Sequence, residues 1–294
     1  MSDIFVRFWG VRGSIPTPGP RTRRYGGNTS CVEVRVDDTL LIFDAGTGLR
    51  ELGVQLQRGP PKPLTLHLFL SHPHWDHIQG FPFFGPAYAQ GTTLYVYGPS
   101  DDDKNYQLLS GQMSNAYFPV RFSDLGANIV SRSFSGPRVK LDGVTVTAFG
   151  QRHPGGSVGF RVDHEGRSVV FATDSELDLL LLDPRVVERD KGALRRLPAE
   201  LVTAVQGADL LIADAQYTDD EYVQRVGWGH PRATTAVDLA VQAGARRLAL
   251  THHDPMHGDR DVEQLVLECR ERAEVTHGAE LEVFAAREGV TLKL

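Results

Sequence analysis

The sequence Ser-His-Pro-His-Trp-Asp-His at residues 71–77 constrains this chain more than any other segment. It places four potential metal ligands within six positions, His72, His74, Asp76 and His77. Imidazole and carboxylate groups hold zinc and similar transition metals at neutral pH. A histidine-rich surface loop is the alternative interpretation, but the spacing His-x-His-x-Asp-His is far more restrictive than histidine enrichment. The segment therefore predicts a metal site.

The ligand-rich segment follows residues 64–70, an apolar stretch that predicts a buried strand. A loop that follows a strand lies at the carboxyl edge of a sheet, where α/β proteins usually carry their sites. Residues three or four apart on a helix share a face. If the loop turns into a helix, His72 therefore points the same way as Asp76, and His74 the same way as His77. Two such pairs indicate two metals, with further ligands from elsewhere in the chain.

Three more candidate ligands each follow a predicted strand, and they are His153, Asp174 and His252. Alone, each of them is more often a cap or turn residue than a ligand. Together with the first segment, they are expected to complete the metal site. His253 is an alternative to His252. Neighbouring residues on a strand point to opposite sides, so only one of these two rings is expected to be a ligand.

Strands and helices alternate along the chain, without a short repeat or a break in composition. We predict one domain over residues 1–294, with two sheets packed face to face and helices outside. Residues 98–140 are expected to be an insertion near the rim of the site or at a dimer surface, and residues 117–120 and those that follow to be irregular. The predicted strands are residues 4–9, 31–36, 40–43, 64–70, 94–97, 144–149, 158–162, 168–172, 209–213, 247–250, 281–284 and 290–294. The predicted helices are residues 49–57, 104–113, 234–243 and 262–273, with an exposed helix or connector at 186–196.

Composition limits the classes of partner and the location of the protein. A net charge of −6 weighs against a long nucleic-acid footprint, which needs a basic face. A small anionic substrate stays compatible, because bound metal ions reverse the local field. Cys31 and Cys269 lie far apart and are expected to be reduced core thiols. The first residues lack a signal peptide and no apolar run approaches membrane-spanning length, so we expect a cytoplasmic enzyme that does not bind membranes.

These motifs, in this order, resemble those of the metallo-β-lactamase superfamily over most of the chain. The resemblance also includes Asp44, in the sequence Phe-Asp-Ala-Gly-Thr-Gly. It implies a four-layer αββα sandwich with the site at one edge of both sheets. It also implies two divalent metal ions, with zinc expected and manganese or iron as alternatives. The implied ligands are His72, His74 and His153 for one metal, Asp76, His77 and His252 for the other, and Asp174 as the bridge. Asp44 would orient the ligand loop.

Residues 209–240 resemble the phosphodiesterase branch of that superfamily, which includes ribonuclease Z and small-molecule phosphodiesterases. In that branch a carboxylate after a strand supports a histidine before a helix. The resemblance implies that Asp214 orients His230, which protonates the leaving oxygen or clamps the phosphate. Asp76, Asp214 and His230 are thus the predicted catalytic residues. Ribonuclease Z has Ser-Thr after this histidine, whereas this chain has Pro-Arg, and Arg232 either binds phosphate or faces solvent.

Three functions are compatible with these residues. The first is a phosphodiesterase acting on a small phosphodiester such as a cyclic nucleotide or dinucleotide, as a possible homodimer. The second is a thioester, lactone or β-lactam hydrolase on the same fold. The third is a non-hydrolytic metal-bound sensor or redox protein. Arg21, Arg23 and Arg24, in the Gly/Pro-rich segment 10–28, either reach a phosphate or form a solvated charge run. That segment is either a mobile flap or a loop packed near the site.

Overall fold

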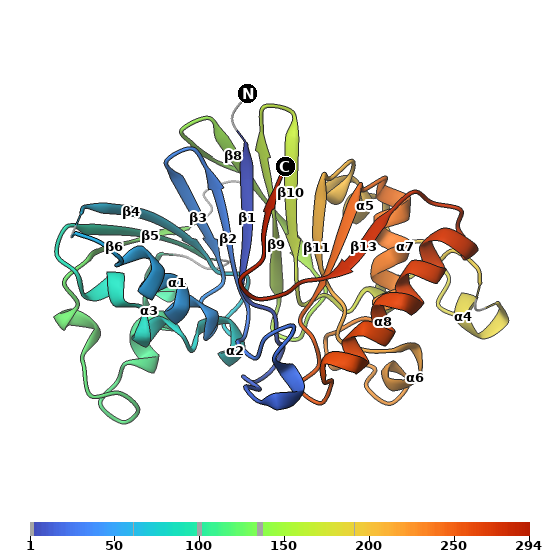
Figure 1. The fold of residues 1–294 in the computed structure, drawn as a ribbon, viewed down its shortest axis with the longest axis horizontal. Coiled ribbons are helices and arrows are strands. Elements are labelled where there is room, and N and C mark those ends of the chain that lie inside the picture. Colours follow the sequence, from blue (N-terminus) through green and yellow to red (C-terminus); the bar gives the residue numbers. More distant parts are fainter. Residues whose placement is uncertain (1–2, 61, 99–101, 134–137, 191) are drawn as a thin grey trace.

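Two β-sheets face each other at the centre of the molecule (Figure 1). The computed structural model describes residues 3–60, 62–98, 102–133, 138–190 and 192–294. The strands of the first sheet are β1 (Ile4–Gly10), β2 (Cys31–Val36), β3 (Thr39–Phe43), β4 (Leu64–Phe69), β5 (Thr92–Gly98), β6 (Asn128–Ser133) and β14 (Thr291–Lys293). In the described residues these seven strands lie in the order β14-β1-β2-β3-β4-β5-β6. From β3 to β6 neighbouring strands are parallel, so their carboxyl ends meet at one edge.

The second sheet comes from the later part of the chain. Its strands are β7 (Arg138–Leu141), β8 (Val144–Gln151), β9 (Ser157–His164), β10 (Arg167–Ala172), β11 (Leu210–Asp214), β12 (Arg247–Thr251) and β13 (Glu282–Ala285). They lie in the order β13-β12-β11-β10-β9-β8-β7. From β10 to β13 the strands are parallel, whereas β7 to β10 form antiparallel pairs.

Helices cover the outer face of each sheet, with α1 and α3 on the first and α5, α7 and α8 on the second (Figure 1). The helices are α1 (Gly48–Leu56), α2 (Trp75–Ile78), α3 (Asp102–Gln112), α4 (Val186–Arg189), α5 (Ala199–Val205), α6 (Asp219–Tyr222), α7 (Ala233–Ala243) and α8 (Asp259–Glu271). Helix α7 ends at Gly244, whose φ of 62° is the left-handed conformation that a glycine adopts easily. Across the described ranges, every helix falls short of the length and hydrophobicity that crossing a membrane requires.

Three hydrophobic clusters fill the three interfaces between these layers. Between the sheets, aromatic rings meet from both sides, and the ring centroid of Phe43 lies 5.3 Å from Phe69 and 5.6 Å from Phe160. A second cluster joins the first sheet to α1 and includes Leu52. A third joins the second sheet to α7 and α8 and includes Val237. The predicted four-layer αββα sandwich is therefore confirmed.

The sequence pattern missed two strands and two α-helices of the described residues. Residues 128–133 were expected to be irregular, and this is wrong because they form β6. Strand β7 and helices α5 and α6 were not predicted. Strands β6 and β7 are partly exposed edge strands, so their apolar alternation is weak. The segment 98–140 thus supplies an edge strand to each sheet, although its residues 99–101 and 134–137 lie outside the described residues. Whether it is an insertion remains a prediction.

Candidate metal centre

The predicted ligands come together at one edge of the two sheets. The segment 71–77 follows β4 and enters α2, which lies at the lower edge of the sheets in Figure 1. His153 follows β8, Asp174 follows β10 and His252 follows β12. The ligand atoms of His72, His74, His153 and Asp174 all lie within 4.8 Å of one another. The same limit holds for a second group, made of Asp76, His77, Asp174 and His252.

Asp174 belongs to both groups because its two carboxylate oxygens face different rings. Oδ2 lies 3.5 Å from Nε2 of His72 and 3.8 Å from Nε2 of His153. Oδ1 lies 3.2 Å from Nε2 of His77 and 3.2 Å from Nε2 of His252. One carboxylate thus stands between two sets of ligand atoms, which is the arrangement that a bridging ligand requires.

Ring nitrogens that converge at short distance suit a cation between them. Nε2 of His153 lies 2.9 Å from Nδ1 of His74, and Nε2 of His77 lies 3.3 Å from Nε2 of His252. Two ligands that each lie about 2.1 Å from one ion are separated by about 3.0–3.4 Å in octahedral or tetrahedral geometry. The observed separations are close to this range, so the pairs are spaced as ligands of one ion are.

Four of these rings have their Nδ1 atoms held by neighbouring groups. Nδ1 of His153 lies 2.8 Å from the carbonyl oxygen of Gly229, and Nδ1 of His252 lies 2.8 Å from Oε1 of Gln216. A ring that donates from Nδ1 presents the lone pair of Nε2 to the cluster. The amide of Gln216 is oriented in turn, because its Nε2 donates to Tyr217 and Asp254.

The other two rings depend on Asp44 and Ser71. Nδ1 of His77 lies 2.7 Å from Oδ2 of Asp44, and Nδ1 of His72 lies 3.0 Å from Oγ of Ser71. The hydroxyl of Ser71 donates to Asp44, which leaves its oxygen to accept from His72. Nε2 of His72 is buried and has no hydrogen-bond partner in the part of the chain that the structure describes. A metal ion would satisfy this atom, so the residues present fit one.

Burial and neighbouring charge set the protonation states within the cluster. Burial, and then the neighbouring His77, lower the pKa of His72 to about 2, so this ring is neutral near pH 7, as a metal-binding imidazole must be. Burial disfavours the ionised form of Asp174. The adjacent His252 and His77 outweigh that effect and hold the pKa of Asp174 well below its usual range.

Backbone strain concentrates at the same residues. Asp44, Asp174 and His252 have φ values of 62°, 56° and 59°, in the left-handed region that residues other than glycine rarely adopt. Such a conformation costs about 1–3 kcal/mol and persists where its surroundings enforce it. At Gly13 a Cβ atom would lie 2.3 Å from Nδ1 of His252, so a side chain at this position would displace the ring.

Of the two neighbouring histidines, His252 turns toward the cluster and His253 turns away. Nε2 of His253 lies 3.1 Å from the carbonyl oxygen of Ala286, and its ring meets the ring of Tyr25 edge-on at 5.8 Å. Both residues lie after the end of β12, and His252 has a φ of 59°, so strand alternation does not account for this separation.

His230 and Asp214 form the predicted pair beside the cluster. Nδ1 of His230 lies 2.8 Å from Oδ2 of Asp214, and its ring stacks on His252 with centroids 4.7 Å apart. The side chain of His230 is 10% exposed, so the ring reaches the surface of the site. The guanidinium of Arg232 pairs with Asp178 at 2.6 Å, and its side chain is 12% exposed. Arg232 therefore does not face bulk solvent, and phosphate binding by this residue remains a prediction.

The segment 10–28 packs against the cluster as a loop. The N–H of Ser14 donates to Oδ2 of Asp76 at 2.7 Å. The buried side chain of Arg12 donates to the carbonyl oxygens of Gly26, Asp254 and His257. This network of a guanidinium with backbone carbonyls fixes the loop beside His252.

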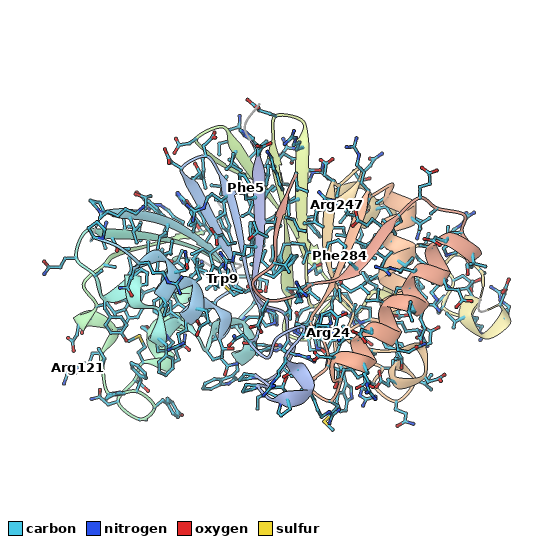
Figure 2. All side chains as sticks on the ribbon, viewed as in Figure 1. Phe5, Trp9, Arg24, Arg121, Arg247 and Phe284 are labelled. Atoms are coloured by element: carbon cyan, nitrogen blue, oxygen red, sulfur yellow. The ribbon has the colours of Figure 1, made fainter. Side chains whose placement is uncertain are left out.

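The arginines of that loop contact helix α8. The guanidinium of Arg24 pairs with Glu263, and Figure 2 places Arg24 at the start of this helix. The guanidinium of Arg21 lies 3.8 Å from Asp261 and donates to the carbonyl oxygen of Met256. Two of the three arginines that sequence reasoning offered for phosphate binding therefore have acidic partners within the chain.

A comparison with known families identifies the fold and the chemistry of this site. A family model described as "Beta-lactamase superfamily domain" matches residues 39–253, a range that includes all the predicted ligands. The chain belongs to this superfamily. The predictions of the metallo-β-lactamase superfamily, of its sandwich fold and of a metal-dependent hydrolase are thus confirmed.

Relatives of this superfamily protein cover nearly its whole length. Ribonuclease Z from Haloarcula marismortui is 27% identical to it over 300 residues, which cover 90% of this chain and 91% of the relative. The metallo-β-lactamase fold protein YhfI from Bacillus subtilis superposes with a TM-score of 0.69 at 20% identity, and all of both chains is covered. A diphosphatase from the PhnP family superposes with a TM-score of 0.65 at 16% identity, covering 99% of this chain and 98% of that chain.

Sequence reasoning missed several groups that orient the candidate ligands of this superfamily protein. Ser71 and Gln216 lie one or two residues from predicted site residues, and this adjacency was their only signal. The N–H of Ser14 and the carbonyl oxygen of Gly229 act through the backbone, so residue type gave no indication of either. Glu176 is a further missed residue, since its carboxylate accepts hydrogen bonds from the loop before His230.

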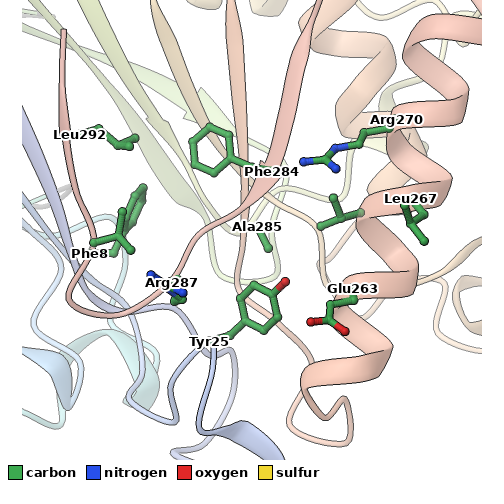
Figure 3. A pocket seen from close by; sticks show the side chains of 11 residues that line it. Phe8, Tyr25, Glu263, Leu267, Arg270, Phe284, Ala285, Arg287 and Leu292 are labelled. Atoms are coloured by element: carbon green, nitrogen blue, oxygen red, sulfur yellow. The ribbon is translucent and has the colours of Figure 1, made fainter.

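A separate pocket lies between α8 and the edge strands β13 and β14 (Figure 3). Its volume is about 410 Å³, and Phe8, Phe284 and Leu292 contribute to its apolar wall. Arg270 and Arg287 are exposed at its rim. The predicted metal ligands are not among the described residues that line it, so this pocket is apart from the metal centre.

Proposed function

We propose that this β-lactamase superfamily protein is a two-metal phosphodiesterase. The residues that would hold the two ions are His72, His74 and His153 on one side, Asp76, His77 and His252 on the other, and Asp174 between them. The main support for phosphodiester chemistry is the position of His230. This residue is hydrogen-bonded to Asp214 and stacked on His252 beside the cluster. Hydrolysis of esters with good leaving groups does not require such a pair.

The donor set supports divalent transition metals. Neutral imidazoles with carboxylates suit zinc, and manganese and iron accept the same ligands, so we propose zinc first. When bound, two such ions lower the pKa of a water molecule and offset charge on the phosphoryl oxygens during in-line displacement. The buried Nε2 atom of His72, without a partner among the described residues, supports a resident metal on the first side.

His230 would act as the general acid. Its Nδ1 atom is committed to Asp214, so the imidazolium form carries a transferable proton on Nε2. Asp214 fixes the orientation of the ring and stabilises the imidazolium. Asp76 is proposed to share in catalysis, because its Oδ2 atom lies 3.1 Å from Nε2 of His252 and accepts the N–H of Ser14.

The surroundings of the site favour a small phosphodiester, such as a cyclic nucleotide or dinucleotide. Arg21 and Arg24 lie beside acids of α8, and the net charge is −6, which both disfavour binding of a long nucleic-acid backbone. Trp75 and Trp228 adjoin site residues in the sequence, and their side chains are 64% and 63% exposed. Exposed indoles beside a phosphate-binding site suit stacking on a nucleobase.

A second candidate substrate is the RNA on which ribonuclease Z acts. The similarity to the Haloarcula marismortui ribonuclease Z over nine-tenths of both chains favours it. A direct comparison separates the two candidates. Purified protein would be assayed on a precursor tRNA and on a panel of cyclic nucleotides and dinucleotides. Turnover confined to the small substrates supports the first candidate, and cleavage of the precursor tRNA supports the second.

The test of phosphodiester chemistry combines metal analysis with one substitution. Elemental analysis of purified protein should find about two divalent ions per chain. His230→Ala should lower turnover of a cyclic nucleotide, whose ribose leaving group needs a proton, about 10²–10⁴-fold. It should lower turnover of bis-p-nitrophenyl phosphate much less, and it should leave the metal content near that of the parent protein. Loss of metal in His230→Ala would make this histidine structural and contradict the proposal.

The alternative ester chemistries are separated by the same variant. Hydrolysis of a thioester, lactone or β-lactam that survives in His230→Ala, without phosphodiester turnover in the parent protein, would favour the second function considered. Iron in the purified protein, without turnover of any ester, would favour a sensor or redox protein. A homodimer and a cytoplasmic location remain predictions from the sequence.

A further inference from the structure

Glu176 is a buried acidic residue two positions after Asp174, and it belongs to neither candidate ligand set. Its side chain is 1% exposed. Oε1 accepts hydrogen bonds from the N–H of Gly227 at 2.6 Å and from the hydroxyl of Tyr222 at 2.8 Å. Oε2 accepts the N–H of Gly229 at 2.8 Å. A buried carboxylate is costly unless it is hydrogen-bonded, and here two of its three donors come from one loop.

Gly229 connects that carboxylate to both parts of the site. Its N–H donates to Glu176, and its carbonyl oxygen accepts from Nδ1 of His153 at 2.8 Å. Its φ of 96° favours glycine, and a Cβ atom there would lie 2.4 Å from Nδ1 of His153. The next residue in the chain is His230. One residue thus carries the acceptor for a candidate ligand and precedes the candidate general acid.

The backbone of Glu176 adds a second connection. Its N–H donates to the carbonyl oxygen of Arg152, the residue before His153, at 2.7 Å. Glu176 therefore binds the chain next to both partners of the contact between His153 and Gly229. Its backbone N–H binds the residue before His153, and its carboxylate binds Gly229. Two residues further on, Asp178 accepts the N–H of Arg232 at 2.9 Å, which fixes the chain after His230.

We propose that Glu176 is a positioning residue that sets, through Gly227 and Gly229, both the orientation of His153 and the placement of His230. The proposal rests on the proposed function, in which His153 binds metal and His230 protonates the leaving group. In Glu176→Gln an NH2 group replaces one of the two carboxylate oxygens. This group cannot accept the backbone N–H that the oxygen accepts in the parent protein, so at least one hydrogen bond to the loop is lost. The loop would then release the carbonyl oxygen that orients His153.

The first test measures metal affinity without turnover. Zinc affinity of the full-length protein would be determined by competition with a chromophoric chelator. Glu176→Gln should weaken one of two zinc-binding steps by about 10- to 100-fold, as loss of a group that orients a metal ligand does. Asp209→Asn is the matched control, because Asp209 accepts the N–H of Ser168 at 2.8 Å at the far end of β10. It should keep the zinc affinity of the parent protein.

The second test examines the placement of His230 by comparing kcat for two substrates, one whose leaving group needs a proton and one whose leaving group does not. A p-nitrophenolate leaves without protonation, whereas the ribose hydroxyl of a cyclic nucleotide needs a proton. Glu176→Gln should therefore lower kcat for the cyclic nucleotide at least 10-fold more than kcat for bis-p-nitrophenyl phosphate. Loss of folding or of zinc in general would lower both rates together. If Glu176→Gln does not fold, Glu176→Asp, which withdraws the carboxylate by one methylene group, is measured in the same way.

Unchanged zinc affinity together with an unchanged ratio of the two rates, in a folded variant, would overturn the proposal. Failure of the underlying function looks different. In that case the parent protein itself shows no phosphodiester turnover, or His153→Ala keeps both zinc-binding steps intact.

Discussion

Asp44 accepts a hydrogen bond from Nδ1 of His77 at 2.7 Å, in a position where neither side chain reaches solvent. The same carboxylate accepts the N–H and the hydroxyl of Ser71. One residue after β3 therefore fixes the beginning and the end of the ligand-rich segment. Its left-handed φ of 62° is consistent with this constraint.

Asp44→Asn should weaken metal binding at the side of the cluster that contains His77. The amide retains one acceptor oxygen for three donors, so the orientation of His77 or of Ser71 is lost. We expect affinity for one of the two metals to fall about 10- to 100-fold in a chelator competition titration. Ser30→Ala is the control, because the hydroxyl of Ser30 makes only a 3.4 Å contact with the same carboxylate. Equal affinities in Asp44→Asn and the parent protein would contradict this role.

Asp174→Asn should affect both metals, whereas substitution of a single histidine should affect one. The two oxygens of Asp174 face different rings, and an amide presents only one oxygen. We expect the metal content of Asp174→Asn to fall below that of both His153→Ala and His252→Ala. Elemental analysis of the three variants, purified in parallel, checks this order. A loss of only one ion in Asp174→Asn would show that its carboxylate serves one side.

The sequence predicted the side chains of this site better than the contacts that hold them. His72 could be selected because the spacing His-x-His-x-Asp-His is restrictive, and His153 and His252 because they follow strands in a chain that contains this segment. Gly229 could not be selected in the same way, because its carbonyl oxygen is common to every residue. Only the folded chain brings this atom next to His153.

The same reasoning explains which parts of the fold were predicted. β4 and β10 are buried and apolar, so their sequences indicated strands directly. β6 has a partly exposed sequence that includes Ser131 and Arg132, and pairing with β5 rather than local pattern makes it a strand. Edge elements of this kind depend on tertiary contacts that a single sequence does not display.

Cys31 and Cys269 should resist alkylation in the folded protein. Both are free and buried, as the sequence led us to expect. Burial, and then the carboxylate of Asp44, raise the pKa of Cys31, and burial likewise raises the pKa of Cys269. The thiolate is the reactive form, so its population at pH 8 should be negligible in both residues. Mass spectrometry after iodoacetamide treatment should find no modified cysteine in the native protein and two in guanidinium chloride. Rapid modification of either native thiol would show that this part of the core opens.

Trp75 and Trp228 should stabilise the base of a bound nucleotide if the substrate is a small nucleotide phosphodiester. Both indoles are largely exposed although tryptophan is usually buried, and the third tryptophan, Trp9, is 7% exposed. Stacking on one aromatic side chain contributes about 1–3 kcal/mol per base. In the parent protein, AMP should therefore inhibit more strongly than ribose 5-phosphate, which has the phosphate but no base.

Replacing both indoles by alanine should abolish most of that difference, while inhibition by ribose 5-phosphate stays the same. The measurement is the inhibition constant of each compound against turnover of bis-p-nitrophenyl phosphate. Phe5→Ala is the control, because Phe5 is an exposed aromatic residue that Figure 2 places on β1, away from α2 and the ligand edge. A preference for AMP that persists in the double variant would assign recognition of the base to other residues. Equal inhibition by both compounds in the parent protein would instead argue against a nucleotide substrate.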